Sequence, residues 1–172
     1  KQFTDEYDNV ILKNITEETK NKNLRGKPGA LQAGFDIAKG EIFLMTDADC
    51  TVNEKWITTI VSQFLNKNDK TINKNVGLVA AYTSVKGKNI FAKFQDAEWT
   101  YMNTYASAGI GLGTVLGCFG NNLAVSKEAY YKIGGYQNLE FSVTEDEARI
   151  IINPFIEKRL IEENAAEHIY TY

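Results

Sequence analysis

A short apolar run, EIFLMT at residues 41–46, constrains the fold of this chain more than any other feature. It follows a glycine, and such a run is typical of a strand buried on both faces of a parallel sheet. Further strand-like runs lie at residues 9–13, 76–85, 122–125 and 168–172, and helical patterns at 28–39, 53–65 and 90–107 alternate with them. This alternation predicts an α/β domain with a mainly parallel central sheet flanked by helices.

The length of 172 residues fits a single domain over residues 1–172, with a core large enough to need no disulfide or structural metal. Cys50 and Cys118 are far apart in the sequence, so we expect free thiols. A net charge of -3 gives no basic surface for nucleic acid, and the single histidine argues against a histidine-centred metal site. No run of about 18 apolar residues predicts a membrane span.

Two carboxylates, Asp47 and Asp49, directly follow the 41–46 strand in the triplet Asp47-Ala48-Asp49. Open α/β sheets bind ligands beyond the carboxyl ends of their strands. Carboxylates two residues apart on a turn can converge on one Mg²⁺ or Mn²⁺, which would bridge a diphosphate. The alternative is an ordinary solvated turn, because such triplets are frequent by chance.

A second acidic group, Glu145 and Asp146, follows Thr144 at a predicted helix start. A carboxylate is the simplest base for taking a proton from an acceptor hydroxyl, and a helix N-terminus favours its ionised form. Acidic residues in a first helical turn are also ordinary capping partners. Both interpretations of Asp146 therefore stay open on the residues alone.

Three further groups are candidates for binding. Lys27 precedes the first helix and can contact phosphate or simply be solvated. Gly120-Asn121-Asn122 precede a strand, where their amides can bind sugar hydroxyls or build a turn. Aromatic residues of the 90–107 helix can stack on a sugar or pack in the core. Residues 108–120, rich in small side chains, are expected to form a loop that passes close to another part of the molecule.

Three segments in order, GKPGALQAGFDIAKGEIFLMTDADC, GCFGNNLAVSKEAYYKIGGY and TEDEARI, resemble the family 2 glycosyltransferases. This group contains cellulose, chitin and hyaluronan synthases and many bacterial polysaccharide enzymes. The resemblance spans about residues 8–172. It implies a GT-A fold, an inverting single displacement, and a UDP- or GDP-type sugar donor.

On the donor side, the resemblance implies that Asp47 and Asp49 are the DxD pair, with Asp49 as the direct metal ligand. Lys27 would lie near the donor diphosphate. Gln32 departs from the asparagine usual at its position, which puts that contact in doubt.

On the acceptor side, the resemblance implies that Asp146 is the catalytic base and that Glu145 shapes the acceptor site. Gly120, Asn121 and Asn122 are the further candidates for that site. The acceptor would be a saccharide or a lipid-linked sugar, in polysaccharide or glycolipid synthesis.

Two features of the family are not found in the sequence: the N-terminal nucleotide-binding strand with its Tyr-Asn-Glu-like turn, and a Gln-x-x-Arg-Trp motif followed by membrane helices. We therefore expect a central catalytic fragment that is soluble, binds donor weakly, and comes from a parent anchored at the cytoplasmic face of a membrane. Two alternatives are a sugar nucleotidyltransferase and a non-catalytic carbohydrate- or partner-binding domain of the same fold.

Overall fold

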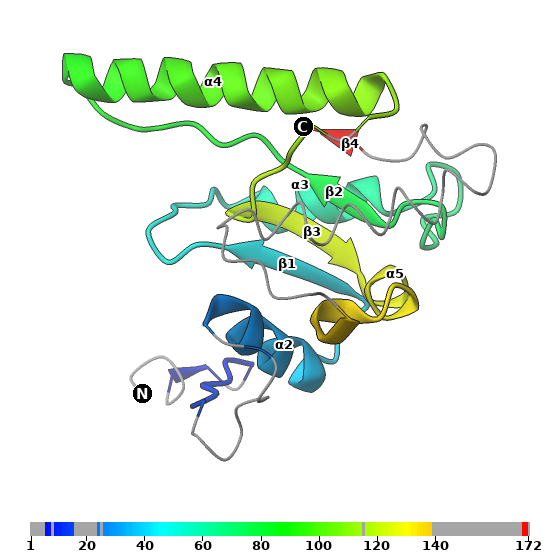
Figure 1. Ribbon diagram of the computed structural model, residues 1–172. Coiled ribbons are helices and arrows are strands. Elements are labelled where there is room, and N and C mark those ends of the chain that lie inside the picture. The colour runs from blue at the N-terminus through cyan, green and yellow to red at the C-terminus, as the bar shows by residue number, and fades with distance from the viewer. Residues whose placement is uncertain are drawn as a thin grey trace.

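The computed structural model describes residues 6–7, 9–15, 24, 26–114, 116–138 and 170–171 of the chain (Figure 1). Its elements, in chain order, are α2 (Lys27–Ile37), β1 (Ile42–Thr46), α3 (Trp56–Gln63), β2 (Leu78–Ala80), α4 (Ile90–Gly111), β3 (Asn122–Ser126), α5 (Lys127–Lys132), the 3-10 helix η1 (Gly135–Asn138) and β4 (Tyr170–Thr171). The helices expected at 28–39, 53–65 and 90–107 correspond to α2, α3 and α4. Of the strands expected at 41–46 and 122–125, both are present with ends shifted by one residue.

The described strands form one sheet in the order β1-β3-β2-β4. Strand β3 is antiparallel to both of its neighbours, with Thr46 opposite Asn122 and Ala80 opposite Leu123, whereas β4 is parallel to β2. The expectation of a mainly parallel sheet is therefore wrong for the described strands. Strands β1 and β2 nevertheless run in the same direction, so their carboxyl ends share one edge with the start of β3.

The path between β2 and β3 explains the antiparallel pairing. After Ala80 the chain runs outward, and α4 then returns alongside it, as Figure 1 shows. The backbone N–H of Val85 donates to Asp96 at 2.8 Å, and Asn103 donates to the carbonyl of Thr83 at 3.2 Å, which ties the outward and returning segments together. The connection from Ala80 to Asn122 leaves and re-enters the sheet at the same end of the strands. Strand β3 therefore runs opposite to β2. A parallel crossover would have carried the chain to the other edge.

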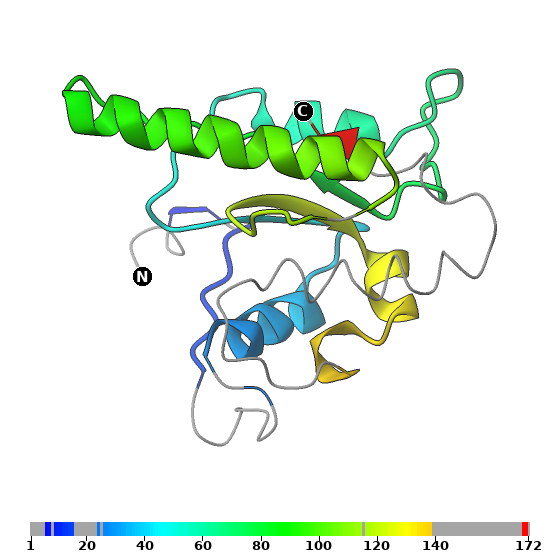
Figure 2. The same ribbon diagram turned by 45° about the horizontal axis from the view of Figure 1, so that its top comes forward.

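Helices cover both faces of the sheet (Figure 2). On one face, α2, α5 and η1 enclose a core whose strand residues are Phe43, Met45, Leu78, Ala80, Leu123 and Val125. On the other face, α3 packs Ile60 and Phe64 against Val79 and Ala124. The strand residues alternate between these two cores, because successive side chains of a strand point to opposite faces. For β1 the expected burial of both faces is confirmed in part, because Phe43 and Met45 are buried whereas Ile42 and Leu44 on the other face are partly buried.

Aromatic rings dominate the core beneath α2. Phe35 stacks on Phe43 with ring centroids 4.5 Å apart, and Tyr130 meets Phe35 edge-on at 4.9 Å. The Tyr130 hydroxyl donates to Gln32 at 2.6 Å and accepts from the backbone N–H of Tyr136 at 3.0 Å. Burial raises the pKa of Tyr130 to about 12, although the Tyr136 hydrogen bond opposes the shift. Gln32 is thus a buried structural residue, which is the role of the position that departs from the family pattern.

One glycine of the 108–120 segment, Gly109, permits a close approach, and it lies in the helix and not in the loop that the sequence suggested. Helix α4 continues to Gly111, and the loop begins only after it. A Cβ at Gly109 would lie 2.8 Å from the carbonyl oxygen of Thr114 and 2.5 Å from the Leu116 side chain. The chain folds back over its own helix at this point, so only glycine fits at position 109. A loop starting at residue 108 is therefore a wrong prediction.

The strand expected at residues 9–13 is also a wrong prediction. Residues 10–15 form no regular element, and Val10, Ile11 and Leu12 are exposed. An isolated strand leaves its backbone groups without a ladder, and no described residue pairs with this segment. The strand expected at 76–85 is shorter in the structure: it comprises β2, with one further backbone hydrogen bond to β3 at each end, from Ser126 to Gly77 and from Ala81 to Asn122. Among the described residues, we find no helix that combines the length and apolar character needed to cross a membrane.

Candidate active site

The turn after β1 presents the two aspartates of the triplet. The backbone N–H of Cys50 donates to the carbonyl of Asp47 at 3.1 Å, which closes the turn. Asp47 is half-buried and Asp49 is exposed. Both carboxylates therefore lie just beyond the carboxyl end of a buried strand, on a turn as the sequence predicts. Cys50 and Cys118 form no disulfide, which confirms the expected free thiols.

Lys27, the first residue of α2, contacts this turn directly. Its Nζ lies 2.8 Å from Oδ1 of Asp47, and the two side chains are 50% and 38% exposed. Gly26, with φ 69, turns the chain into the helix, and no side chain caps the helix start. An ion pair this exposed contributes about 0–1 kcal/mol, so a stronger ligand can replace either partner at small cost. Two residues that sequence analysis assigned separately to the donor are thus in contact.

The start of β3 reaches the same edge from the other side. Asn122 is paired in register with Thr46, the last residue of β1. Its side-chain oxygen accepts from Nε1 of Trp56 at 2.9 Å, and its side-chain nitrogen donates to the carbonyl of Tyr82 at 2.9 Å. Asn122 therefore links α3, β3 and the exit of β2. Its amide holds the edge together, a role that sequence analysis did not foresee.

The neighbouring residues of β3 complete the edge. The Thr83 hydroxyl donates to the side-chain oxygen of Asn121 at 3.3 Å. Gly120 leaves open space, because a Cβ at this position would meet no atom within 4 Å. Trp99 is half-buried and packs on Phe119 with ring centroids 4.8 Å apart. Gly120 and Asn121 thus border open room at the edge that Asp47 occupies.

The described residues provide two carboxylates for a cation and no cluster of three or more metal-ligating side chains. Mg²⁺ is commonly bound by one or two carboxylates, with substrate phosphates and water as the other ligands. Asp47 and Asp49 on an open turn fit this pattern as a donor set. A cation held there would be completed by the diphosphate of a substrate.

The proposed catalytic base, Asp146, cannot be placed in this site. Glu145 and Asp146 lie outside the described residues, so their place relative to Asp47 stays a prediction.

Sequence analysis missed Trp56 and Tyr82, which support Asn122. A tryptophan just after the aspartate turn was one available signal, since its ring N–H needs an acceptor when it is partly buried.

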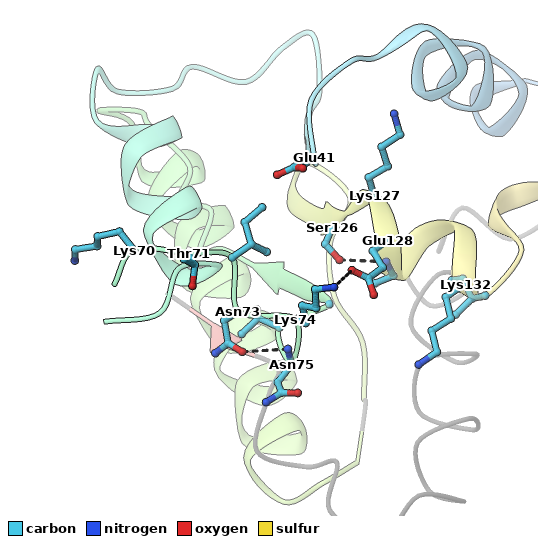
Figure 3. Close-up of a pocket in the computed structure, with 15 residues that line it drawn as sticks. Glu41, Lys70, Thr71, Asn73, Lys74, Asn75, Ser126, Lys127, Glu128 and Lys132 are labelled. Carbon is cyan, nitrogen blue, oxygen red and sulfur yellow. Dashed lines mark hydrogen bonds and ion pairs between the residues drawn. The ribbon is translucent and has the colours of Figure 1, made fainter. Parts of the chain in front are cut away.

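Two cavities lined by described residues differ in size and position. A cavity of about 110 Å³ lies between the exit of β2 and α4, lined by Tyr82, Asn103 and Phe119 among others. A larger one, of about 1090 Å³, lies at the opposite edge of the sheet, where Glu41, Ser126 and Lys127 are found. Figure 3 shows Lys74 and Glu128 pointing toward one another there, with Nζ and Oε2 3.7 Å apart. Volume alone would thus select the edge that lacks the aspartate pair.

The family model described as glycosyl transferase family 2 matches residues 1–134. This range is well over half of the chain and contains Lys27, Asp47, Asp49 and Asn122. The chain belongs to glycosyl transferase family 2. Its members have the GT-A fold of nucleotide-sugar transferases and transfer a sugar from an activated donor to an acceptor, so the domain binds both. No curated protein and no solved structure matches the chain.

Proposed function

We propose that this domain catalyses an inverting transfer of a hexose or N-acetylhexosamine from a UDP- or GDP-type donor to a hydroxyl of a saccharide or lipid-linked acceptor. The observation that carries the proposal is the 2.8 Å contact between Lys27 and Asp47 at the carboxyl edge of the sheet. It brings a cation for phosphate next to a carboxylate for a metal, on the edge where α/β folds bind ligands. The parent protein would work in polysaccharide or glycolipid synthesis at the cytoplasmic face of the membrane.

On the donor side, Asp49 and Asp47 would hold Mg²⁺ or Mn²⁺. Such a cation neutralises the charge that builds on the diphosphate as the sugar leaves. Lys27 would exchange its contact with Asp47 for one with a phosphate oxygen, because phosphate offers a charge-assisted hydrogen bond of similar or greater strength. The exposed setting of the Lys27–Asp47 pair makes this exchange inexpensive.

On the acceptor side, the Asp146 carboxylate would take the proton of the acceptor hydroxyl. The acceptor oxygen forms a bond to the anomeric carbon while the bond from that carbon to the diphosphate oxygen breaks, and the nucleoside diphosphate leaves with the electron pair. Glu145, Gly120 and Asn121 would border the acceptor. Asn122 would act mainly by positioning this edge, since both ends of its amide already have partners.

The test separates donor binding from transfer. Calorimetry with UDP or GDP, with and without Mn²⁺, should give weak binding that depends on the metal and is lost in Asp49→Asn. Asp146→Asn should bind the nucleotide as the unchanged chain does. In the parent protein the same Asp146→Asn change should remove sugar transfer, which needs the base. Nucleotide binding that ignores both the metal and position 49 would exclude the proposed donor site.

A further inference from the structure

Helix α4 buries one side and exposes apolar residues on the opposite side. Its inner side faces the rest of the molecule and includes Ala92, Asn103, Ala106 and Ile110, all buried. Its outer side carries exposed apolar residues that recur at helical spacing, namely Ile90, Phe94, Tyr101 and Tyr105, and Leu112 at the C-cap continues the spacing. The outer side of a surface helix is normally polar, and a helix that is apolar all round is normally covered. The exposed apolar side chains on the outer side of α4 are therefore a candidate binding surface.

The first turns of α4 concentrate this character. Ile90, Phe91 and Phe94 are 70%, 66% and 69% exposed, which means that most of each side chain faces solvent. This end of the helix projects well beyond the sheet in Figure 1. Lysines 86, 88 and 93 lie within four residues of these side chains along the chain, and all three are exposed. We call these six residues the basic-aromatic tip.

The charges of the tip have no explanation in the stability of the helix. The N-terminus of a helix carries positive partial charge, which favours acidic residues. The first turn of α4 contains no acidic residue, and Lys93 lies within it. The first acidic residue along α4, Asp96, is half-buried and accepts from the backbone N–H of Val85 at 2.8 Å. The tip thus exposes apolar side chains to water and places lysines near the positive end of the helix, and both arrangements are unfavourable. An external anionic partner with an apolar layer would relieve both.

We propose that the basic-aromatic tip docks on the surface of an anionic lipid bilayer. Apolar side chains of an interfacial helix enter the boundary between headgroups and acyl chains, while lysines remain at the level of the anionic headgroups. Protein interfaces differ, because lysine is depleted in their buried centres. The three lysines around Ile90, Phe91 and Phe94 therefore favour a lipid surface over a second copy of the chain.

Electrostatics and burial act together in this arrangement. Each lysine near an anionic surface strengthens binding about fivefold at moderate salt. Burial of the Phe91 and Phe94 rings adds an apolar contribution that does not depend on lipid charge. Binding should therefore need both anionic lipid and the two rings, and it should weaken as salt screens the lysines.

Vesicle flotation tests the proposal on the chain as it is. Vesicles of phosphatidylcholine with phosphatidylglycerol should carry the chain upward, and vesicles of phosphatidylcholine alone should carry about tenfold less or none. The double variant F91Q/F94Q should lose about tenfold or more of the binding, because glutamine keeps the helix propensity and removes the rings. The triple change K86Q/K88Q/K93Q should remove the dependence on anionic lipid.

Ile57→Gln is the matched control, since Ile57 is 61% exposed on α3, outside the tip. This variant should bind as the unchanged chain does, and thermal melting should show that all variants fold. Equal binding to neutral and anionic vesicles, or full binding by F91Q/F94Q, would overturn the proposal. So would light scattering that finds a dimer dissolved by F91Q/F94Q without any vesicle binding, since a second copy would then occupy the tip.

Discussion

The two edges of the sheet contrast in what they contain. The carboxyl edge has the Asp47 and Asp49 turn, the Lys27 ion pair and the hydrogen bonds of Asn122, with a cavity of about 110 Å³ nearby. The opposite edge has the cavity of about 1090 Å³ and a looser pair, Lys74 and Glu128. The comparison teaches that an ion pair at a buried strand end and cavity volume select opposite edges of the same sheet. Each change below therefore pairs a residue of one edge with a counterpart from the other, or tests the core between them.

The largest effect is expected from Asp49→Asn. Loss of a metal-binding charge removes stabilisation of the leaving diphosphate and should lower the transfer rate of the parent protein at least about a hundredfold. Glu128→Gln, an exposed carboxylate of the opposite edge, should leave the rate within about twofold. Initial rates over a series of Mn²⁺ concentrations measure both. Equal losses in the two variants would remove the distinction between the edges.

The two ends of β3 provide the next comparison. Asn122→Ala leaves the Trp56 ring N–H and the Tyr82 carbonyl without their partner, which should lower the free energy of unfolding by about 2 kcal/mol. Ser126→Ala removes a 3.2 Å cap from Ala129 at the start of α5 and should cost about 1 kcal/mol. Urea unfolding measures both values.

Activity then separates these two variants. Asn122→Ala should reduce transfer in the parent beyond its loss of folded protein, whereas Ser126→Ala should not. A fully active Asn122→Ala would show that the residue supports only folding.

The core beneath α2 lies between the edges and should respond to alkaline pH. The unfolded chain loses the Tyr130 proton near the ordinary value of 10.0, whereas burial holds the folded pKa at about 12. The unfolded state thus binds fewer protons between these values, so the free energy of unfolding falls as pH rises, by at most about 1.4 kcal/mol per pH unit from this group. Urea unfolding at several pH values should show this slope.

Tyr130→Phe should flatten the alkaline slope while lowering stability at neutral pH, because Gln32 and the Tyr136 N–H lose a partner. Some slope should remain from Tyr131, whose pKa is also raised by partial burial and by Asp36. An unchanged slope in Tyr130→Phe would contradict this assignment.

The smallest effect concerns the two lysines that form ion pairs. Lys27→Ala should raise the donor KM of the parent about tenfold with little change in kcat, since a charge-assisted bond to phosphate is lost. Lys74→Ala should change neither constant, because its partner Glu128 lies at the other edge. Steady-state kinetics with varied donor measure the difference. A KM unaffected by Lys27→Ala would place the diphosphate elsewhere.

Local signals in the sequence were sufficient for several elements. The helical patterns of α2 and α4 and the apolar run of β1 depend on neighbours a few residues away, and the structure contains all three elements. The direction of β3 was not predictable in this way. It depends on α4 returning to the edge that the chain left, which follows from tertiary contacts of residues such as Asp96 and Asn103.

The candidate site was predictable in its chemistry and less so in its contacts. The aspartate pair, Lys27 and the residues before β3 were singled out from sequence, and the structure gathers them at one edge. The amide of Asn122 was expected to contact a ligand, but it bonds Trp56 and Tyr82, which are 66 and 40 residues away in sequence. Such pairings depend on the fold and leave no periodic signal. The role of Asp146 stays a prediction.

The segment between β2 and β3 has a consequence for how such a domain can diversify. The segment leaves the sheet after Ala80 and re-enters it in β3, which pairs with β2. At this point the backbone N–H of Ala81 donates to the carbonyl of Asn122 at 2.8 Å. Because both ends of the connection between β2 and β3 lie side by side, this connection can be lengthened or replaced without shifting the register of the strands. Closing a longer loop adds only a small entropy cost. Changes in this connection can therefore alter the surface next to the aspartate turn without changing the pairing of the strands.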